Sequence, residues 1–172
     1  LVKGHLYESN CDSSLRYLMY RARTKEENTQ FDDVYIRGHT DKGTLTFVFQ
    51  QPVSVLQIKA TDESSWEHLR IQPGMVAVNL ACMVEILTNG YLKGGLHRLT
   101  APPEDQAYND RLALLYFVLP NDRLKRKALH SPYLRRMGYG KEGSMDSDTP
   151  ANEWVRARFK DNWLPYDQRP PK

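Results

Sequence analysis

Three residues have the types and spacing of a metal site. His39 and Asp41 stand two positions apart, so on an extended strand their side chains point the same way. Such a pair is common by chance, and the interpretation depends on a third ligand. His97, in the run GGLHRL, is the candidate. Two imidazoles and one carboxylate leave the opposite positions of a metal open, which is the ligand set of non-haem Fe(II) oxygen chemistry. The alternative for His97 is a buried histidine with ordinary hydrogen bonds.

A second candidate is an arginine inside an apolar run. Arg111 opens the run RLALLYFV and shares a strand face with Ala113, Leu115 and Phe117. A guanidinium among apolar neighbours is costly unless it is paired. A carboxylate satisfies it with two parallel hydrogen bonds. The sequence therefore indicates either an anion site or an arginine that reaches water at the entrance of a strand.

Short strands must position these residues. Runs rich in β-branched and aromatic residues, broken by Gly and Pro, predict strands at 15–20, 34–37, 44–50, 55–60, 66–71, 75–80, 95–100 and 111–119. The segment 21–33 is polar and is predicted to be a loop, and 82–88 is predicted to be a helical turn. This spacing is typical of an antiparallel sandwich, barrel or jelly roll, and it argues against a doubly wound α/β fold.

The texture of the chain changes after Pro120. The basic segment 121–138 is typical of a solvated surface more than of a phosphate site. Thr149 and Pro150 form a helix start, and a stripe of apolar residues follows at intervals of four. The stripe consists of Ala151, Val155, Phe159 and Trp163. We expect a helix that packs outside the sheet, and two regions: a β core at 1–120 and a helical extension with a tail at 121–172.

Composition narrows the class of protein. The chain has 172 residues, a formal net charge of +3 and two cysteines. Its length suits one domain, and a disulfide scaffold is excluded. No apolar run approaches 18 residues, and no concentrated basic face is evident. We therefore expect a cytoplasmic globular protein with reduced thiols and with neither a nucleic acid nor a membrane as its partner.

Several motifs in order resemble one family. The segment from His39 to Pro120 resembles the catalytic core of the Fe(II)- and 2-oxoglutarate-dependent dioxygenases, in the branch of isopenicillin N synthase and the plant flavonoid and gibberellin oxidases. The segment HTDKGTLT is similar to the HTD-x-GTLT segment of that branch. The later pieces LQI, Trp66, PGMVAVN, LTNG and LHR follow in the order of the family. Arg111 falls where the Arg-x-Ser motif of the family begins.

The resemblance implies a fold, a chemistry and a site. The fold would be mainly β, a cupin-like double-stranded β-helix (jelly roll) with the C-terminal helix outside. His39, Asp41 and His97 would bind Fe(II), whereas Arg111 and Tyr20 would hold the far carboxylate of 2-oxoglutarate. With O2, such an enzyme converts 2-oxoglutarate to succinate and CO2 and oxidises a C–H bond of a small molecule, here in specialised metabolism.

Some residues depart from the family pattern. Ala113 stands where the family has a serine that donates to the cosubstrate, Leu18 replaces an asparagine, and Ala81-Cys82 replaces Gly-Asp. Two alternatives therefore stay open: an Fe(II) oxidase of the same fold that uses no 2-oxoglutarate, and a non-catalytic cupin-like binding module. Family members are longer than this chain, which starts with Leu1 and not Met. We expect that N-terminal helices and the first strands of the domain are missing.

Overall fold

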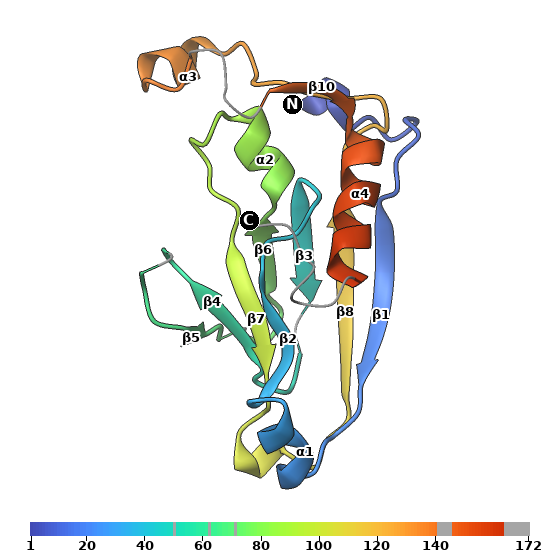
Figure 1. Ribbon diagram of the computed structural model, residues 1–172, viewed down its shortest axis with the longest axis vertical. Coiled ribbons are helices and arrows are strands. Elements are labelled where there is room, and N and C mark those ends of the chain that lie inside the picture. Colours follow the sequence, from blue (N-terminus) through green and yellow to red (C-terminus); the bar gives the residue numbers. More distant parts are fainter. Residues whose placement is uncertain (50, 62, 71, 141–145, 164–172) are drawn as a thin grey trace.

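Two antiparallel sheets build the core of the molecule (Figure 1). The computed structural model describes residues 1–49, 51–61, 63–70, 72–140 and 146–163, with side chains described as far as residue 159. The strand orders are β1-β8-β3-β6 and β2-β7-β4-β5. Eight antiparallel strands in two sheets that interleave in this way form a jelly roll, so the predicted fold class is confirmed.

The elements have the following bounds. The first sheet contains β1 (Ser14–Tyr20), β8 (Arg111–Val118), β3 (Leu45–Phe49) and β6 (Val76–Leu80). The second contains β2 (Val34–His39), β7 (Leu96–Thr100), β4 (Leu56–Lys59) and β5 (Glu67–His68). A small third sheet pairs β9 (Lys125–Arg126) with β10 (Ser147–Pro150). The helices are α1 (Lys25–Gln30), α2 (Cys82–Leu87), α3 (Pro132–Arg136) and α4 (Ala151–Trp163), with 3-10 turns η1 (Val2–Gly4) and η2 (Glu104–Gln106).

Alternation along the strands decides which side chains reach the interior. In β8, Arg111 and Ala113 are buried, whereas Leu112 between them is 49% exposed. In β3, Thr46 and Val48 are buried in the same way. This period of two is the consequence of the pleat, in which successive side chains point to opposite faces.

One side of the first sheet is apolar and exposed. Its members come from three strands and point away from the interior. We call this surface the outer apolar face; it consists of Leu15, Tyr17 and Met19 on β1, Leu112 and Tyr116 on β8, and Val76 on β6. Tyr17 alone leaves 66% of its surface exposed. An exposed apolar surface of this kind is what we expected if a further segment covers the sheet in the whole protein.

Helix α1 lies where the sequence analysis predicted a loop. It begins after Thr24, whose side chain accepts a hydrogen bond from the backbone N–H of Glu27, and the Glu27 carboxylate accepts one from the N–H of Thr24. This reciprocal capping box satisfies two N–H groups at the helix start. The loop prediction was wrong because the polar composition of the segment outweighed this local signal.

The strand predictions hold, with one strand much shorter than expected. The eight strands all lie between Ser14 and Val118, and β5 has only two residues where six were predicted. The first strands of the core, which we expected to be missing, are present as β1 and β2. Whether a segment precedes them in the whole protein stays a prediction.

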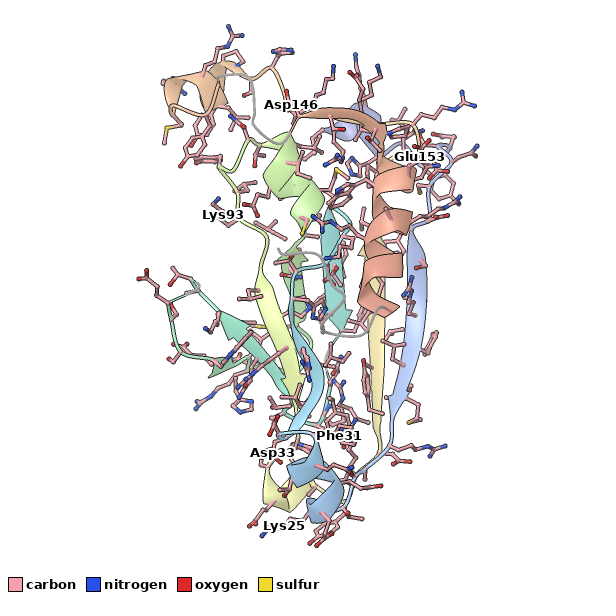
Figure 2. All side chains as sticks on the ribbon, in the orientation of Figure 1. Lys25, Phe31, Asp33, Lys93, Asp146 and Glu153 are labelled. Atoms are coloured by element: carbon pink, nitrogen blue, oxygen red, sulfur yellow. The ribbon has the colours of Figure 1, made fainter. Side chains whose placement is uncertain are left out.

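The predicted C-terminal helix is present as α4. It begins at Ala151, one residue later than expected, because Pro150 ends β10. Ala151 packs against Met83 and Leu87 of α2. In Figure 1, α4 lies outside the two sheets, and Figure 2 shows its residue Glu153 at the surface. Phe159 is only partly covered, and the side chain of Trp163 lies outside the described residues.

Candidate functional site

His39, Asp41 and His97 converge on one point. The pairing of β2 with β7 puts His39 beside His97, and the two rings lie 4.3 Å apart between centroids. Asp41 follows two residues after the end of β2. Its Oδ1 lies 3.8 Å from the Nε2 of each histidine, and the three ligand atoms all lie within 4.8 Å of one another. Strand pairing therefore assembles the arrangement that the sequence predicted for a metal site.

Backbone carbonyls fix the proton positions of both histidines. His39 Nδ1 donates to the carbonyl of Arg37 at 2.8 Å, and His97 Nδ1 donates to the carbonyl of Gly95 at 3.0 Å. A carbonyl can only accept, so Nδ1 carries the proton and the lone pair of each neutral ring is on Nε2, which faces Asp41. Burial, together with the neighbouring His97, lowers the pKa of His39 and favours the neutral, metal-binding form. Such outer hydrogen bonds are typical of metal-binding histidines.

The carboxylate of Asp41 is held from its other oxygen. Oδ2 accepts a hydrogen bond of 2.6 Å from Thr46 Oγ1 and one of 2.9 Å from Asn79 Nδ2. The carbonyl of Asp41 also accepts from the N–H of Cys82 at the start of α2. These contacts orient Oδ1 toward the two histidines. The sequence analysis quoted the segments that contain Thr46 and Asn79, yet it assigned neither residue a role.

Gly95 leaves the space that Asn79 needs. A Cβ at position 95 would overlap the Asn79 side-chain oxygen. Gly95 also supplies the carbonyl that orients His97. The absence of a side chain at this position is thus linked to the geometry of both Asp41 and His97.

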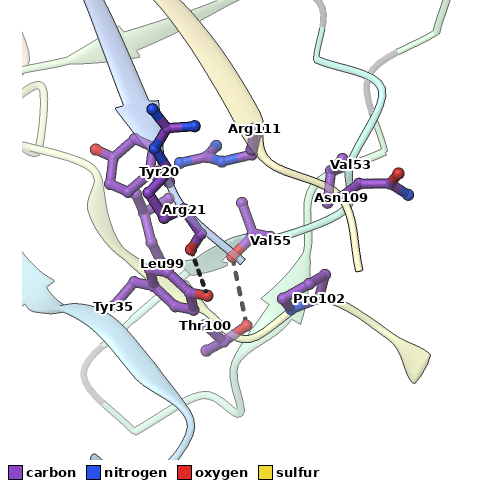
Figure 3. Close-up of a pocket in the computed structure, with 10 residues that line it drawn as sticks. All are labelled: Tyr20, Arg21, Tyr35, Val53, Val55, Leu99, Thr100, Pro102, Asn109 and Arg111. Atoms are coloured by element: carbon purple, nitrogen blue, oxygen red, sulfur yellow. Dashed lines mark hydrogen bonds between the residues drawn. The ribbon is translucent and has the colours of Figure 1, made fainter. Parts of the chain in front are cut away.

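Arg111 and Tyr20 lie side by side across the β1–β8 pairing. Their Cα atoms are partners in the register, and the Arg111 guanidinium carbon lies 4.2 Å from the centre of the Tyr20 ring. Figure 3 shows the two side chains next to each other at the edge of a small pocket of about 10 Å³. Burial raises the pKa of the Tyr20 phenol and lowers the pKa of Arg111. The phenol therefore stays a neutral hydrogen-bond donor at physiological pH.

Arg111 is buried, with only 4% of its surface exposed, so the alternative of an arginine that reaches water is wrong. Within the described residues, none of the ion pairs includes Arg111. Its guanidinium donates instead to the side-chain oxygen of Gln51. A buried cation with only neutral neighbours suits an anionic ligand.

A single cavity of about 460 Å³ contains all five predicted site residues. Its walls come from both sheets and are mostly apolar, with Leu18, Leu56, Leu115 and Phe117 among them. A pocket with apolar walls and a few convergent polar groups is typical of a small-molecule site. The donor set fits Fe(II) at one place in the cavity and a carboxylate at another, and the roles of the individual residues stay predictions.

The basic segment after Pro120 belongs to no such site. Lys125 and Lys127 pair with Asp148, and these side chains are exposed. In Figure 2, Lys93 and Asp146 also lie at this end of the molecule, at the surface. The solvated surface predicted for this segment suits these contacts.

Two fungal proteins have sequences similar to almost the whole chain. The chain is 28% identical to the UPF0676 protein C1494.01 of Schizosaccharomyces pombe, over 99% of this chain and 49% of that protein. It is 27% identical to a 2-oxoglutarate-dependent dioxygenase of Aspergillus fumigatus, over 92% of this chain and 47% of that protein. The chain thus spans about half the length of these relatives.

A solved structure shares the fold. A full-length oxygenase of Neurospora crassa, in complex with alpha-KG and thymine, superimposes with a TM-score of 0.73 at 23% identity, over 91% of this chain and 46% of that one. Residues 9–120 match the family model of the 2OG-Fe(II) oxygenase superfamily, and this match spans the eight strands and the five site residues. The chain therefore belongs to the 2OG-Fe(II) oxygenase superfamily.

Proposed function

We propose that this chain is the catalytic part of an Fe(II)- and 2-oxoglutarate-dependent oxygenase that oxidises a C–H bond of a small organic molecule. The observation that carries the proposal is one cavity with a His-Asp-His cluster and a buried arginine that has no carboxylate partner in the described residues. Membership of the superfamily supports the same chemistry.

Each side chain then has a defined task. His39, Asp41 and His97 hold Fe(II), which supplies the activation of O2 coupled to oxidative decarboxylation of 2-oxoglutarate. Arg111 and Tyr20 bind the far carboxylate of the cosubstrate and so fix its orientation. The apolar walls exclude water from the oxidation and position the C–H bond. Hydroxylation, desaturation and rearrangement are all compatible with these tasks.

The finer assignments rest on the sequence motifs. We place the chain in the branch of isopenicillin N synthase and the plant oxidases, and its substrate in specialised metabolism, because the order HTD, LQ, PG, VN, NG and HR is that of this branch. We expect a cytoplasmic protein whose partner is a small molecule and not a nucleic acid or a membrane. Among the described residues, no helix has the length and apolar character needed to cross a membrane.

One observation favours a second candidate. Ala113 lacks the hydroxyl that the family motif offers to 2-oxoglutarate, which suits an Fe(II) oxidase of the same fold that needs no 2-oxoglutarate. Retention of Arg111 favours the first proposal, because an oxidase without this cosubstrate has no use for a buried guanidinium.

The test compares succinate formation with metal binding. Purified chain with Fe(II), ascorbate, 2-oxoglutarate and O2 should release succinate, and Asp41→Ala should abolish both the release and the binding of Mn²⁺. His68→Ala is the matched control, because His68 is exposed on β5 and its side chain bonds only to Gln57 among the described residues. Metal binding without any 2-oxoglutarate binding would favour the oxidase, and the absence of metal binding would favour a non-catalytic module.

A further inference from the structure

The arginine at the end of the cavity has a neutral partner that no sequence motif indicated. Gln51 lies just beyond β3 and lines the cavity together with Arg111 and Ala113. Val48 of β3 pairs with Leu115 of β8, and the antiparallel register carries the residues after β3 toward the start of β8. The strand pairing therefore explains why the Gln51 side chain meets Arg111.

The amide of Gln51 has capacity left for a ligand. A side-chain amide has one acceptor oxygen and two N–H donors. The oxygen accepts from the Arg111 guanidinium, and no described residue accepts from the nitrogen. An amide fixed in this way presents two donors next to a buried cation. Donors beside a guanidinium suit a carboxylate, which can accept from both groups at once.

Ala113 marks the donor that this site lacks. It lies two residues after Arg111 on the same face of β8, is buried, and lines the cavity. A methyl group cannot donate a hydrogen bond, so position 113 leaves one side of a bound carboxylate without a partner. Gln51 approaches the same guanidinium from the neighbouring strand segment.

We propose that Gln51 is a third residue that binds the far carboxylate of 2-oxoglutarate, donating from its amide nitrogen in place of the hydroxyl that Ala113 lacks. This inference rests on the proposed function. Gln51 then does two things: its oxygen orients Arg111, and its nitrogen contacts the ligand. The carboxylate would have a cation, a phenol and an amide as its partners.

Two 2-oxo acids separate this role from a merely structural one. 2-Oxobutyrate has the keto acid end of 2-oxoglutarate but no far carboxylate. Binding of each acid is measured by calorimetry without O2, in the presence of Mn²⁺, for the wild-type chain and for Gln51→Leu. The expected result is an about tenfold loss of affinity for 2-oxoglutarate, with binding of 2-oxobutyrate and of Mn²⁺ unchanged, as for one hydrogen bond to a charged group.

Two further variants complete the design. Ala113→Ser in the Gln51→Leu background should restore most of the lost affinity, because it returns a donor from the neighbouring strand. Gln57→Leu is the control: Gln57 also accepts from an arginine, Arg98, but on the second sheet and outside the cavity. Its affinity for 2-oxoglutarate should equal that of the wild type.

The outcomes distinguish this inference from the proposed function. Equal affinity of the wild type and Gln51→Leu for 2-oxoglutarate overturns the role of Gln51 and leaves the proposed function intact. An equal loss for both acids also overturns it, because Gln51 would then act on the whole cavity. If the wild type with Mn²⁺ binds neither acid, the proposed function fails, and the role of Gln51 fails with it.

Discussion

Asp41 depends on side chains that are distant from it in the sequence. Thr46 comes from β3 and Asn79 from β6, and both donate to the oxygen that faces away from the histidines. A carboxylate with one oxygen held by two donors presents the other in a fixed direction, which limits the entropy lost when a metal binds. Residues that hold a ligand in this way are part of the metal site even though they never touch the metal.

Gly95→Ala tests this dependence directly. The new Cβ would overlap the Asn79 oxygen, so the amide has to move away from Asp41. We expect Mn²⁺ affinity to fall by about 10- to 100-fold, as is usual when outer partners of a metal ligand are lost. Gly94→Ala is the matched control, because a Cβ there lies 3.4 Å from its nearest neighbour, in ordinary contact. Calorimetry gives both affinities, and equal values for the two variants would contradict the argument.

Arg111→Ala should separate cosubstrate binding from metal binding. Removing the guanidinium removes two charge-assisted hydrogen bonds to the far carboxylate, each of about 1.5 kcal/mol, which together correspond to about a 100-fold rise in the Kd for 2-oxoglutarate. Mn²⁺ affinity should change little, because Arg111 contacts none of the three metal-binding candidates among the described residues.

Arg111→Lys guards against a trivial loss of the fold. Lysine keeps the charge but loses the planar fork, so 2-oxoglutarate affinity should be intermediate between those of the wild type and Arg111→Ala. Unchanged affinity in both variants, with intact folding by circular dichroism, would remove Arg111 from the site.

Elements could be predicted from the sequence where the pattern was strong. Runs such as TLTFVF and RLALLYFV alternate or carry β-branched and aromatic residues, and they became β3 and β8. The helical stripe from Ala151 also held. The histidine and aspartate of HTD could be named because their chemistry is visible in the residue types. Thr46, Asn79 and Gln51 could not, because only the strand pairing brings them to Asp41 and Arg111.

Helix α1 shows the opposite case, a local signal that was present but outweighed. Thr24 and Glu27 have the spacing of a capping box, and the structure forms both hydrogen bonds. We expect Thr24→Ala to lower the free energy of unfolding by about 1 kcal/mol, which corresponds to a fall in Tm of about 2–4 °C for a chain of this size. Thermal melts followed by circular dichroism measure it.

The control for this variant is Thr29→Ala in the same helix, whose hydroxyl donates to the Lys25 carbonyl and caps nothing. Such bonds inside a helix add little stability, so Thr29→Ala should melt close to the wild type. Mn²⁺ affinity should be unchanged in both variants, since α1 contributes no residue to the cavity lining. Equal melting of the two variants would mean that the capping box does not stabilise α1.

The whole molecule combines a closed interior with an open exterior on one side. The two sheets enclose the cavity, and strand alternation sends every second side chain of the first sheet outward. On β1 and β8 these outward positions are apolar, although most exposed strand faces are polar. The relatives are about twice as long as this chain, so we expect the part of the whole protein beyond the matched half to cover this face.

A last prediction concerns association of the chain through the outer apolar face. Because exposed apolar sheet surface favours pairing between molecules, the 172-residue chain should self-associate, with a mean mass in sedimentation velocity that rises with concentration. Tyr17→Lys combined with Leu112→Lys should keep it monomeric, and Mn²⁺ affinity should not change because these side chains point away from the cavity. Tyr108→Lys is the control, since Tyr108 is 90% exposed but lies in a loop outside the outer apolar face. If the wild type is monomeric at every concentration, the outer apolar face needs no cover, and the expectation of a covering segment loses its physical basis.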